Sequence, residues 1–233
     1  MRYEVIMFDL DDTLYDFGMT EKNAFQQLFV EYGLPNGLQD YLSSYKAISK
    51  VLWDELENGI TTLELLKIER FKRLFLEHSL ELDVEKVSDK YIENLGREIH
   101  LIDGVEEMLT DLSGCRFAVL TNGFQIAQHA RVNGSPLNGK FEAIITSEEV
   151  GYQKPQSAIF EYAFKKLGIT DPSSVLMVGD SLTSDIQGGN NFGIDTCWFN
   201  PQQKENRTSI LPTYEIQDWK EMKKIVRGQM LEI

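Results

Sequence analysis

The chain shows two kinds of hydrophobic pattern, which divide it into segments of different structure. Residues 4–8 form a short, nearly continuous apolar run, as expected of a buried strand. From residue 16 to residue 94, apolar positions recur every three or four residues, which predicts amphipathic helices. This stretch has no convincing strand pattern, so we expect residues 16–94 to form a separate helical domain.

Four helices are expected in this segment. The second carries apolar residues between Tyr41 and Leu56 and ends near Asn58. Thr61 and Glu64 have the spacing of a capping box, which predicts the start of the third helix.

The rest of the chain alternates short apolar runs with helical patterns. Such alternation predicts βα units and a parallel sheet, in which ligands bind at the carboxyl ends of the strands. The expected strands are 116–120, 141–145, 175–178 and 194–199, and the expected helices are 124–133, 155–167, 183–192 and 218–227.

Reactive side chains follow three of the expected strands. Asp9 and Asp11 come directly after the first strand, Thr121 and Asn122 follow the second, and Asp180 follows a later one. Side chains two residues apart on an extended chain can face the same side. Carboxylates this close repel one another, which favours a divalent cation, and Mg²⁺ prefers carboxylate oxygens, water and phosphate. A carboxylate can also attack phosphorus and form an aspartyl-phosphate.

Each position also has a simpler interpretation. A lone pair of acids can be an acidic turn. Thr121-Asn122-Gly123 can be only a turn, although the Thr121 hydroxyl and nearby backbone N–H groups can hold phosphate oxygens. Lys154 can be a solvated surface lysine or a point charge on a phosphate. Asp180 and Asp185 can cap a helix or meet its dipole. The order of these residues and their placement at strand ends favour one common site.

The bulk properties exclude several classes of function. With 233 residues, 42% of them hydrophobic, the chain can bury a sizeable core. A net charge of −14 disfavours nucleic-acid binding, because a negative field repels polyanions. No apolar stretch approaches the ~20 residues that span a bilayer, and the first apolar run is too short for a signal sequence. A small phosphorylated substrate is compatible with this charge, because a metal ion and one or two lysines can reverse the field locally. We expect a cytoplasmic protein with buried free thiols at Cys115 and Cys197.

Together the residues at the strand ends resemble the four dispersed motifs of the haloacid dehalogenase-like phosphohydrolases, over essentially the whole chain. The motifs are Asp9-Leu10-Asp11-Asp12-Thr13, Thr121 after its strand, Lys154-Pro155, and Gly179-Asp180 with Asp185. The resemblance implies a Rossmann-like α/β core, with helices on both faces of a parallel sheet, formed by residues 1–15 and 95–233. It also implies that residues 16–94 are an inserted all-helical cap domain.

The resemblance implies a role for each matching position. Asp9 is the expected nucleophile, and Asp11 the expected general acid and then base. The expected phosphate-binding residues are Thr121, Asn122, Gly123 and Lys154. The expected magnesium ligands are Asp9, the backbone carbonyl of Asp11, and Asp180, with Asp185 in a supporting position.

Several segments are further similar to the pyrimidine 5′-nucleotidase subgroup, namely residues 45–53, 58–62, 70–71, 120–124 and 147–151. This similarity implies a 5′-nucleotidase acting on pyrimidine nucleoside monophosphates. The nearest rival substrates are phosphoglycolate and sugar phosphates, and a phosphomutase would keep the same motifs. A metal-independent dehalogenase would need neither Asp11 nor Asp180. A receiver domain would be about half this length, and a non-catalytic relative would be expected to have lost Asp9 or Asp11.

Overall fold

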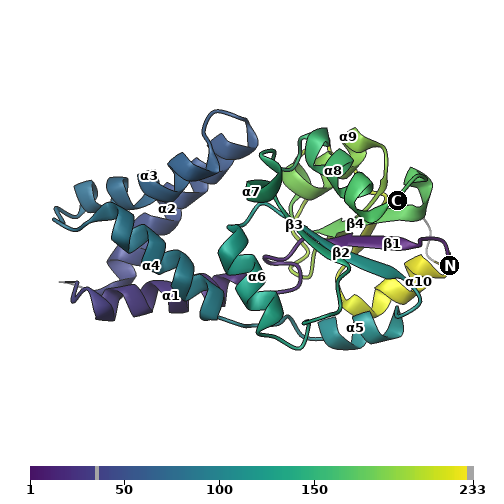
Figure 1. Ribbon diagram of the computed structural model, residues 1–233, viewed down its shortest axis with the longest axis horizontal. Helices are drawn as coiled ribbons and strands as arrows, with labels where there is room; N and C mark the ends of the chain where they lie inside the picture. The colour runs from purple at the N-terminus through teal and green to yellow at the C-terminus, as the bar shows by residue number, and fades with distance from the viewer. Residues whose placement is uncertain (35–36, 230–233) are drawn as a thin grey trace.

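The computed structural model describes residues 1–34 and 37–229 and shows an α/β core with a helical cap at one end (Figure 1). Among these residues, the core contains a six-stranded parallel sheet in the order β3-β2-β1-β4-β5-β6. The strands are β1 (Val5–Phe8), β2 (Arg116–Thr121), β3 (Ala143–Thr146), β4 (Val175–Gly179), β5 (Asp195–Phe199) and β6 (Tyr214–Ile216). The predicted fold class is confirmed.

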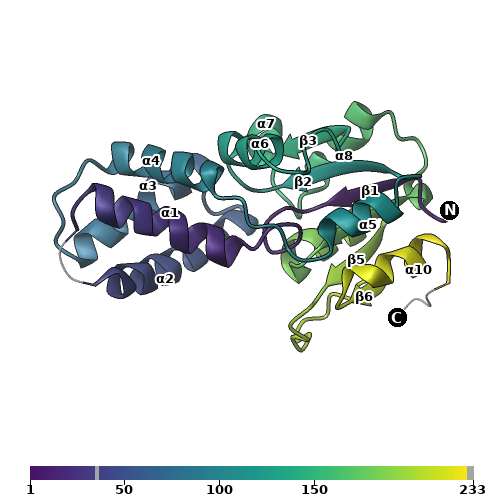
Figure 2. The same cartoon turned by 90° about the horizontal axis from the view of Figure 1, so that it is seen from below.

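The core helices cover both faces of this sheet. Their bounds are α5 (Val105–Asp111), α6 (Gln125–Asn133), α7 (Ser147–Val150), α8 (Ser157–Leu167), η1 (Pro172–Ser174), η2 (Leu182–Ile186), α9 (Gln187–Phe192), η3 (Trp219–Glu221) and α10 (Met222–Val226). Ile6 and Phe8 of β1 pack in one hydrophobic cluster with α5 and α10, which Figure 2 shows together on one face. Val5 and Met7 pack with α8 in another cluster. The strand alternates between the two faces, so burial of both explains its continuous apolar run.

The cap has its own hydrophobic cluster. Its helices are α1 (Phe17–Glu31), α2 (Leu38–Glu57), α3 (Leu63–Glu77) and α4 (Val84–Arg97). Aromatic rings fill its centre: the ring centroids of Tyr45 and Phe71 lie 5.4 Å apart, and those of Phe25 and Tyr45 lie 5.0 Å apart. Burying each such ring stabilises the fold by about 1.5–3 kcal/mol.

The start of α3 corrects one prediction. Thr62 rather than Thr61 is the N-cap, and its side-chain oxygen accepts a hydrogen bond from the Leu65 N–H group. This shift of one residue moves Glu64 out of the position that a capping box requires. The end of α2 is as expected, because Asn58 forms its C-cap.

Two neighbouring chain segments join the cap to the core. The Asp16 N–H group donates to the His100 carbonyl oxygen at 2.8 Å, and the Ile102 N–H group donates to the Leu14 carbonyl oxygen at 3.0 Å. The helix α4 continues to Arg97. The predicted division of the chain at 15/16 and 94/95 stays a prediction.

Other predicted elements differ in detail. The helix expected at 183–192 begins as the π-helical turn η2 and continues as α9, and the helix expected at 218–227 consists of η3 and α10. The sequence analysis missed α5, α7 and the three-residue strand β6. Cys115 and Cys197 are buried free thiols, as predicted.

Candidate active site

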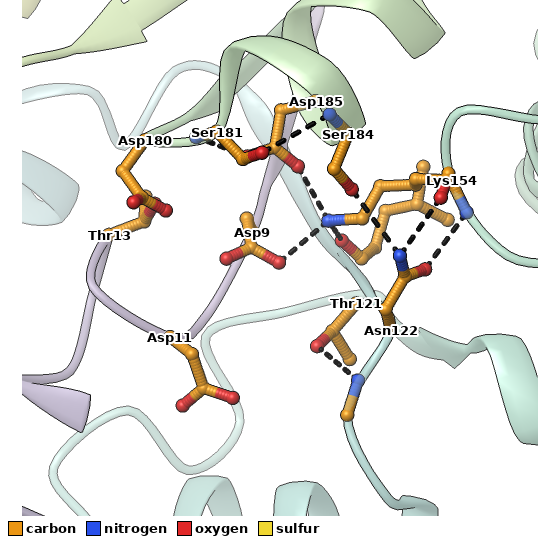
Figure 3. Close-up of polar contacts among 12 residues, drawn as sticks. Asp9, Asp11, Thr13, Thr121, Asn122, Lys154, Asp180, Ser181, Ser184 and Asp185 are labelled. Carbon is orange, nitrogen blue, oxygen red and sulfur yellow. Dashed lines mark hydrogen bonds and ion pairs between the residues drawn. The ribbon is translucent and has the colours of Figure 1, made fainter. Parts of the chain in front are cut away.

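The proposed site residues meet at the carboxyl ends of three neighbouring strands. Asp9 follows β1, Thr121 is the last residue of β2, and Asp180 follows β4. Because β1 lies between β2 and β4, these side chains are brought to one edge of the sheet. Figure 3 shows them around the buried end of Lys154.

Lys154 is a fixed internal cation, since its residue is only 1% exposed. Its Nζ atom donates to Asp9 Oδ1 at 2.6 Å, to Asp185 Oδ1 at 2.7 Å and to the Leu120 carbonyl oxygen at 2.6 Å. Burial alone disfavours the charged form, but Asp185 and Asp9 outweigh it and raise the pKa of Lys154 above the ordinary lysine value. The interpretation of Lys154 as a solvated surface lysine is therefore wrong.

Three carboxylates gather beside this lysine. Asp9, Asp180 and Asp185 each place an oxygen within 4.8 Å of the others. Burial, offset by Lys154 and reinforced by Asp185 and Asp11, raises the pKa of Asp9 to about 7. Burial and the neighbouring Asp185 and Asp9 also raise the pKa of Asp180 well above its usual range. One lysine leaves negative charge uncompensated, and this set of oxygens suits a hard divalent cation.

The position of Asp185 depends on a glycine. A Cβ atom at residue 179 would lie 2.1 Å from an Asp185 carboxylate oxygen, so only Gly179 admits that side chain. Asp185 also accepts a hydrogen bond from the Ser181 N–H group at 3.0 Å. The Gly179-Asp180 pair and Asp185 thus form one structural unit, and Asp185 belongs to the carboxylate cluster itself.

Asp11 lies apart from this cluster. In Figure 3 its side chain points away from Asp180 and Asp185. Its carboxylate instead accepts hydrogen bonds from Arg131 Nη2 at 2.6 Å and Gln128 Nε2 at 2.9 Å. The Asp11 carboxylate is therefore positioned for a different task from that of Asp9, and the expected metal contact through the Asp11 backbone carbonyl stays a prediction.

The sequence analysis missed Gln128 and Arg131. They lie three residues apart on α6 and share one face, and the Gln128 side-chain carbonyl also contacts Arg131. Gln128 further donates to Thr121 Oγ1 at 2.9 Å. A Cβ atom at Gly123 would lie 1.9 Å from Gln128 Nε2, so the glycine makes room for this contact. The sequence does contain a signal for this pair: two polar residues at helical spacing follow shortly after Thr121, at the end of a strand that carries proposed site residues.

Asn122 organises the segment that carries Lys154. Its Nδ2 atom donates to the Lys154 carbonyl oxygen at 3.0 Å, and its Oδ1 atom accepts from the Lys154 N–H group at 2.8 Å. The Gly123 N–H group donates to Thr121 Oγ1 at 3.1 Å. These bonds engage groups that the sequence assigned to phosphate, and the phosphate-binding role of Thr121, Asn122 and Gly123 stays a prediction.

The site opens into a cavity between the core and the cap. The cap and linker residues that line it are Phe17, Trp53, Glu57, Arg70 and Leu95, and the core residues Phe124 and Ala127 lie beside the polar groups described above. Two hydrogen bonds join the cap to the core near this cavity. Thr183 Oγ1 donates to Glu57 at 2.8 Å, and Gln153 Nε2 donates to the Leu56 carbonyl oxygen at 2.7 Å.

Comparison with known proteins identifies the family. Residues 3–193 match the model of the haloacid dehalogenase-like hydrolases. The chain belongs to this family, as the motifs and the helical cap predicted.

Named relatives match over nearly the full length. The chain is 36% identical to the HAD-hydrolase YfnB of Bacillus subtilis, over 95% of this chain and 94% of that protein. It is 35% identical to the pyrimidine 5′-nucleotidase PynA of Streptococcus pneumoniae, over 100% and 98%. It is 32% identical to the pyrimidine 5′-nucleotidase YjjG of Escherichia coli, over 97% and 99%.

The crystal structure of YfnB, which is bound to magnesium and reveals interdomain movement, superimposes with a TM-score of 0.90 and covers 97% of this chain and 99% of that one. None of the helices in the described ranges is long and apolar enough to cross a membrane.

Proposed function

We propose that this protein is a magnesium-dependent phosphomonoesterase that forms an aspartyl-phosphate on Asp9 and acts as a 5′-nucleotidase on pyrimidine nucleoside monophosphates. The observation that carries the chemistry is the buried arrangement of Asp9, Asp180 and Asp185 around Lys154. The substrate class is supported by full-length similarity to the nucleotidases PynA and YjjG.

The arrangement suits a two-step transfer. In the first step, a carboxylate oxygen of Asp9 attacks phosphorus, and the bond from phosphorus to the ester oxygen breaks. Lys154 holds the other side of the Asp9 carboxylate through Oδ1. Protonated Asp11 gives its proton to the leaving alcohol oxygen. In the second step, Asp11 takes a proton from a water molecule, whose oxygen attacks phosphorus, releases phosphate and restores Asp9.

The residues around Asp11 support its exchange of protons. Arg131 and Gln128 fix its side chain apart from the carboxylate cluster, so the group that exchanges protons is held separately from the group that attacks phosphorus. Magnesium would be held by Asp9, Asp180 and Asp185, and when bound it supplies positive charge for the oxygens of the phosphoryl group.

The first test is phosphate release from UMP, dTMP, AMP, phosphoglycolate, glucose 6-phosphate and p-nitrophenyl phosphate, measured with magnesium and with EDTA. We expect magnesium-dependent release that favours the pyrimidine nucleotides. Undiminished release in EDTA would contradict the metal requirement. A preference for phosphoglycolate or the sugar phosphate would keep the chemistry and overturn the substrate class. No release from any compound by correctly folded protein would overturn the phosphatase assignment.

A further inference from the structure

Arg70, on α3 of the cap, is a buried cation, and two of its nitrogen atoms have no partner in the described part of the chain. It is 3% exposed and lines the cavity above the carboxylate cluster. Its Nε and Nη2 atoms have no hydrogen-bond partner within the described ranges, 1–34 and 37–229. A guanidinium group stays charged in proteins, and an unsatisfied buried donor is costly. An arrangement of this kind is explained if a ligand supplies the missing acceptor.

The surroundings of Arg70 hold its charge without occupying its donors. Its guanidinium carbon lies 4.8 Å from the ring centroid of Tyr91 and 5.0 Å from that of Phe124. Ring faces attract the cation and fix its position, yet they accept no strong N–H hydrogen bond. The nearby Glu21 carboxylate pairs with Lys46 at 3.2 Å instead. The group is therefore stabilised as a cation but left open as a donor.

Flat apolar surfaces line the same cavity. The rings of Trp53, from the cap, and Phe124, from the core, meet across the boundary between the two parts at 6.4 Å in an edge-to-face arrangement. Phe17 and Leu95 add apolar surface. A planar ring carrying a hydrogen-bond acceptor matches both features, with its faces against the apolar walls and its acceptor at Arg70.

We propose that Arg70 is a specificity-determining residue that donates a hydrogen bond to a carbonyl oxygen of the pyrimidine base, while Trp53 and Phe124 contact the ring. This inference rests on the proposed nucleotidase function. Uracil, thymine and cytosine all carry a ring carbonyl, whereas adenine has none, so the contact separates pyrimidine nucleotides from AMP. A site that is built to hydrogen-bond a substrate group strongly rejects an analogue that lacks it.

A carboxylate is the other acceptor that a guanidinium group binds well. The walls of the cavity favour the base over a small carboxylic acid. Phosphoglycolate has too little apolar surface to cover the rings of Trp53 and Phe124, whereas a pyrimidine ring has enough.

The first experiment compares the native protein with Arg70→Gln. The control is Arg73→Gln on the same helix, because the Arg73 side chain is 42% exposed and pairs with Glu69 on the surface. The measured quantity is the ratio of kcat/KM for UMP to kcat/KM for p-nitrophenyl phosphate. We expect Arg70→Gln to lower this ratio by about 10- to 100-fold, the range for a hydrogen bond to a charged group. Arg73→Gln should leave the ratio unchanged.

A second experiment changes the substrate, and its first comparison uses only the native protein. Sulfur is a weaker acceptor than oxygen, so 2-thio-UMP or 4-thio-UMP should lose about 10-fold in kcat/KM with the native protein. The same analogue should lose much less with Arg70→Gln, because its partner is already absent. If the native protein hydrolysed both thio analogues with the same kcat/KM as UMP, the proposal would be overturned.

The remaining outcomes separate this inference from the proposed function. Native protein that hydrolyses p-nitrophenyl phosphate but no nucleotide would overturn the nucleotidase function before any variant is compared. Native protein that prefers UMP, with Arg70→Gln keeping that preference, would overturn only the role of Arg70. If Arg70→Gln lowered kcat/KM equally for UMP and p-nitrophenyl phosphate, the role of Arg70 would be structural and the proposal would fail. If the native protein preferred phosphoglycolate and Arg70→Gln abolished that preference, the partner of Arg70 would be a carboxylate instead of a base carbonyl.

Discussion

Two buried cations of the cavity, Lys154 at the core end and Arg70 at the cap end, differ in how completely their donors are satisfied. At the core end, the Lys154 ammonium group has three acceptors, all supplied by the protein. At the cap end, Nε and Nη2 of Arg70 lack partners in the described part of the chain. The Lys154 ammonium group is fully paired before any substrate arrives, whereas Arg70 is left for the substrate to complete.

This difference follows the chemistry of the substrate. Every phosphate monoester presents the same phosphoryl group, so a rigid, preorganised arrangement at Asp9 serves all of them and lowers the barrier to transfer. The leaving alcohol varies, and cap residues such as Trp53 and Arg70 line the cavity together with core residues such as Phe124. We therefore expect changes at the core end to affect all substrates alike, and changes at the cap end to affect them selectively.

The largest expected effect is that of Asp9→Asn. This change removes the nucleophile and keeps the side-chain shape, so kcat should fall by about 10⁴-fold or more for every substrate. The measurement is initial-rate phosphate release from UMP and p-nitrophenyl phosphate, with circular dichroism to confirm folding. Asp171→Asn is the matched control, because Asp171 is an exposed N-cap that asparagine can replace. Turnover within tenfold of native would sink the assignment of Asp9.

A smaller but still general effect is expected for Asp11→Asn. Loss of a general acid and base costs about 10²–10⁴-fold in kcat. The loss should be smaller for p-nitrophenyl phosphate than for UMP, because nitrophenolate leaves readily without a proton. Comparing kcat for the two substrates gives the test. A loss under threefold on UMP would mean that Asp11 is only a neighbour of the site.

The core end could largely be predicted from the sequence, for a geometric reason. Asp9, Thr121 and Asp180 each follow a buried strand, and parallel strands bring such positions to one edge of the sheet. Lys154 was harder to place, because it follows no strand and a lysine is usually solvated; only the folded chain shows its burial among carboxylates.

The rest of the site depends on helix faces and tertiary contacts that a strand pattern does not encode. Arg131 reaches Asp11 from the last turn of α6, and it was not singled out in the sequence. Arg70 occupies an otherwise apolar face of α3. Its environment is set by aromatic rings from α2, α4 and the core, which only the folded chain brings together. The capping error at Thr62 has a local cause, since two adjacent threonines offered alternative N-caps.

The smallest expected effect lies at the boundary between the two ends. Thr183 Oγ1 on η2 donates to Glu57 on α2, so this hydrogen bond helps to hold the cap against the core. A typical intramolecular hydrogen bond contributes about 0.5–1.5 kcal/mol, and the carboxylate acceptor places this one at the upper end of that range. Thr183→Val removes the hydroxyl and keeps the shape of the side chain. We expect KM for UMP to rise by about 2- to 10-fold with kcat little changed, because the bond helps to hold the cap against the core and is remote from the reacting atoms.

Thr110→Val is the matched control for this change. Thr110 is an exposed residue of α5 whose hydroxyl donates only within its own helix, to the Glu106 carbonyl oxygen at 2.8 Å. Its replacement should leave both kinetic constants unchanged. Because this hydrogen bond positions the cap for every substrate alike, Thr183→Val should raise KM for UMP and p-nitrophenyl phosphate by similar factors, unlike Arg70→Gln. A rise in KM for UMP alone would make Thr183 a specificity-determining residue. It would contradict the expectation that only changes at the cap end of the cavity act selectively.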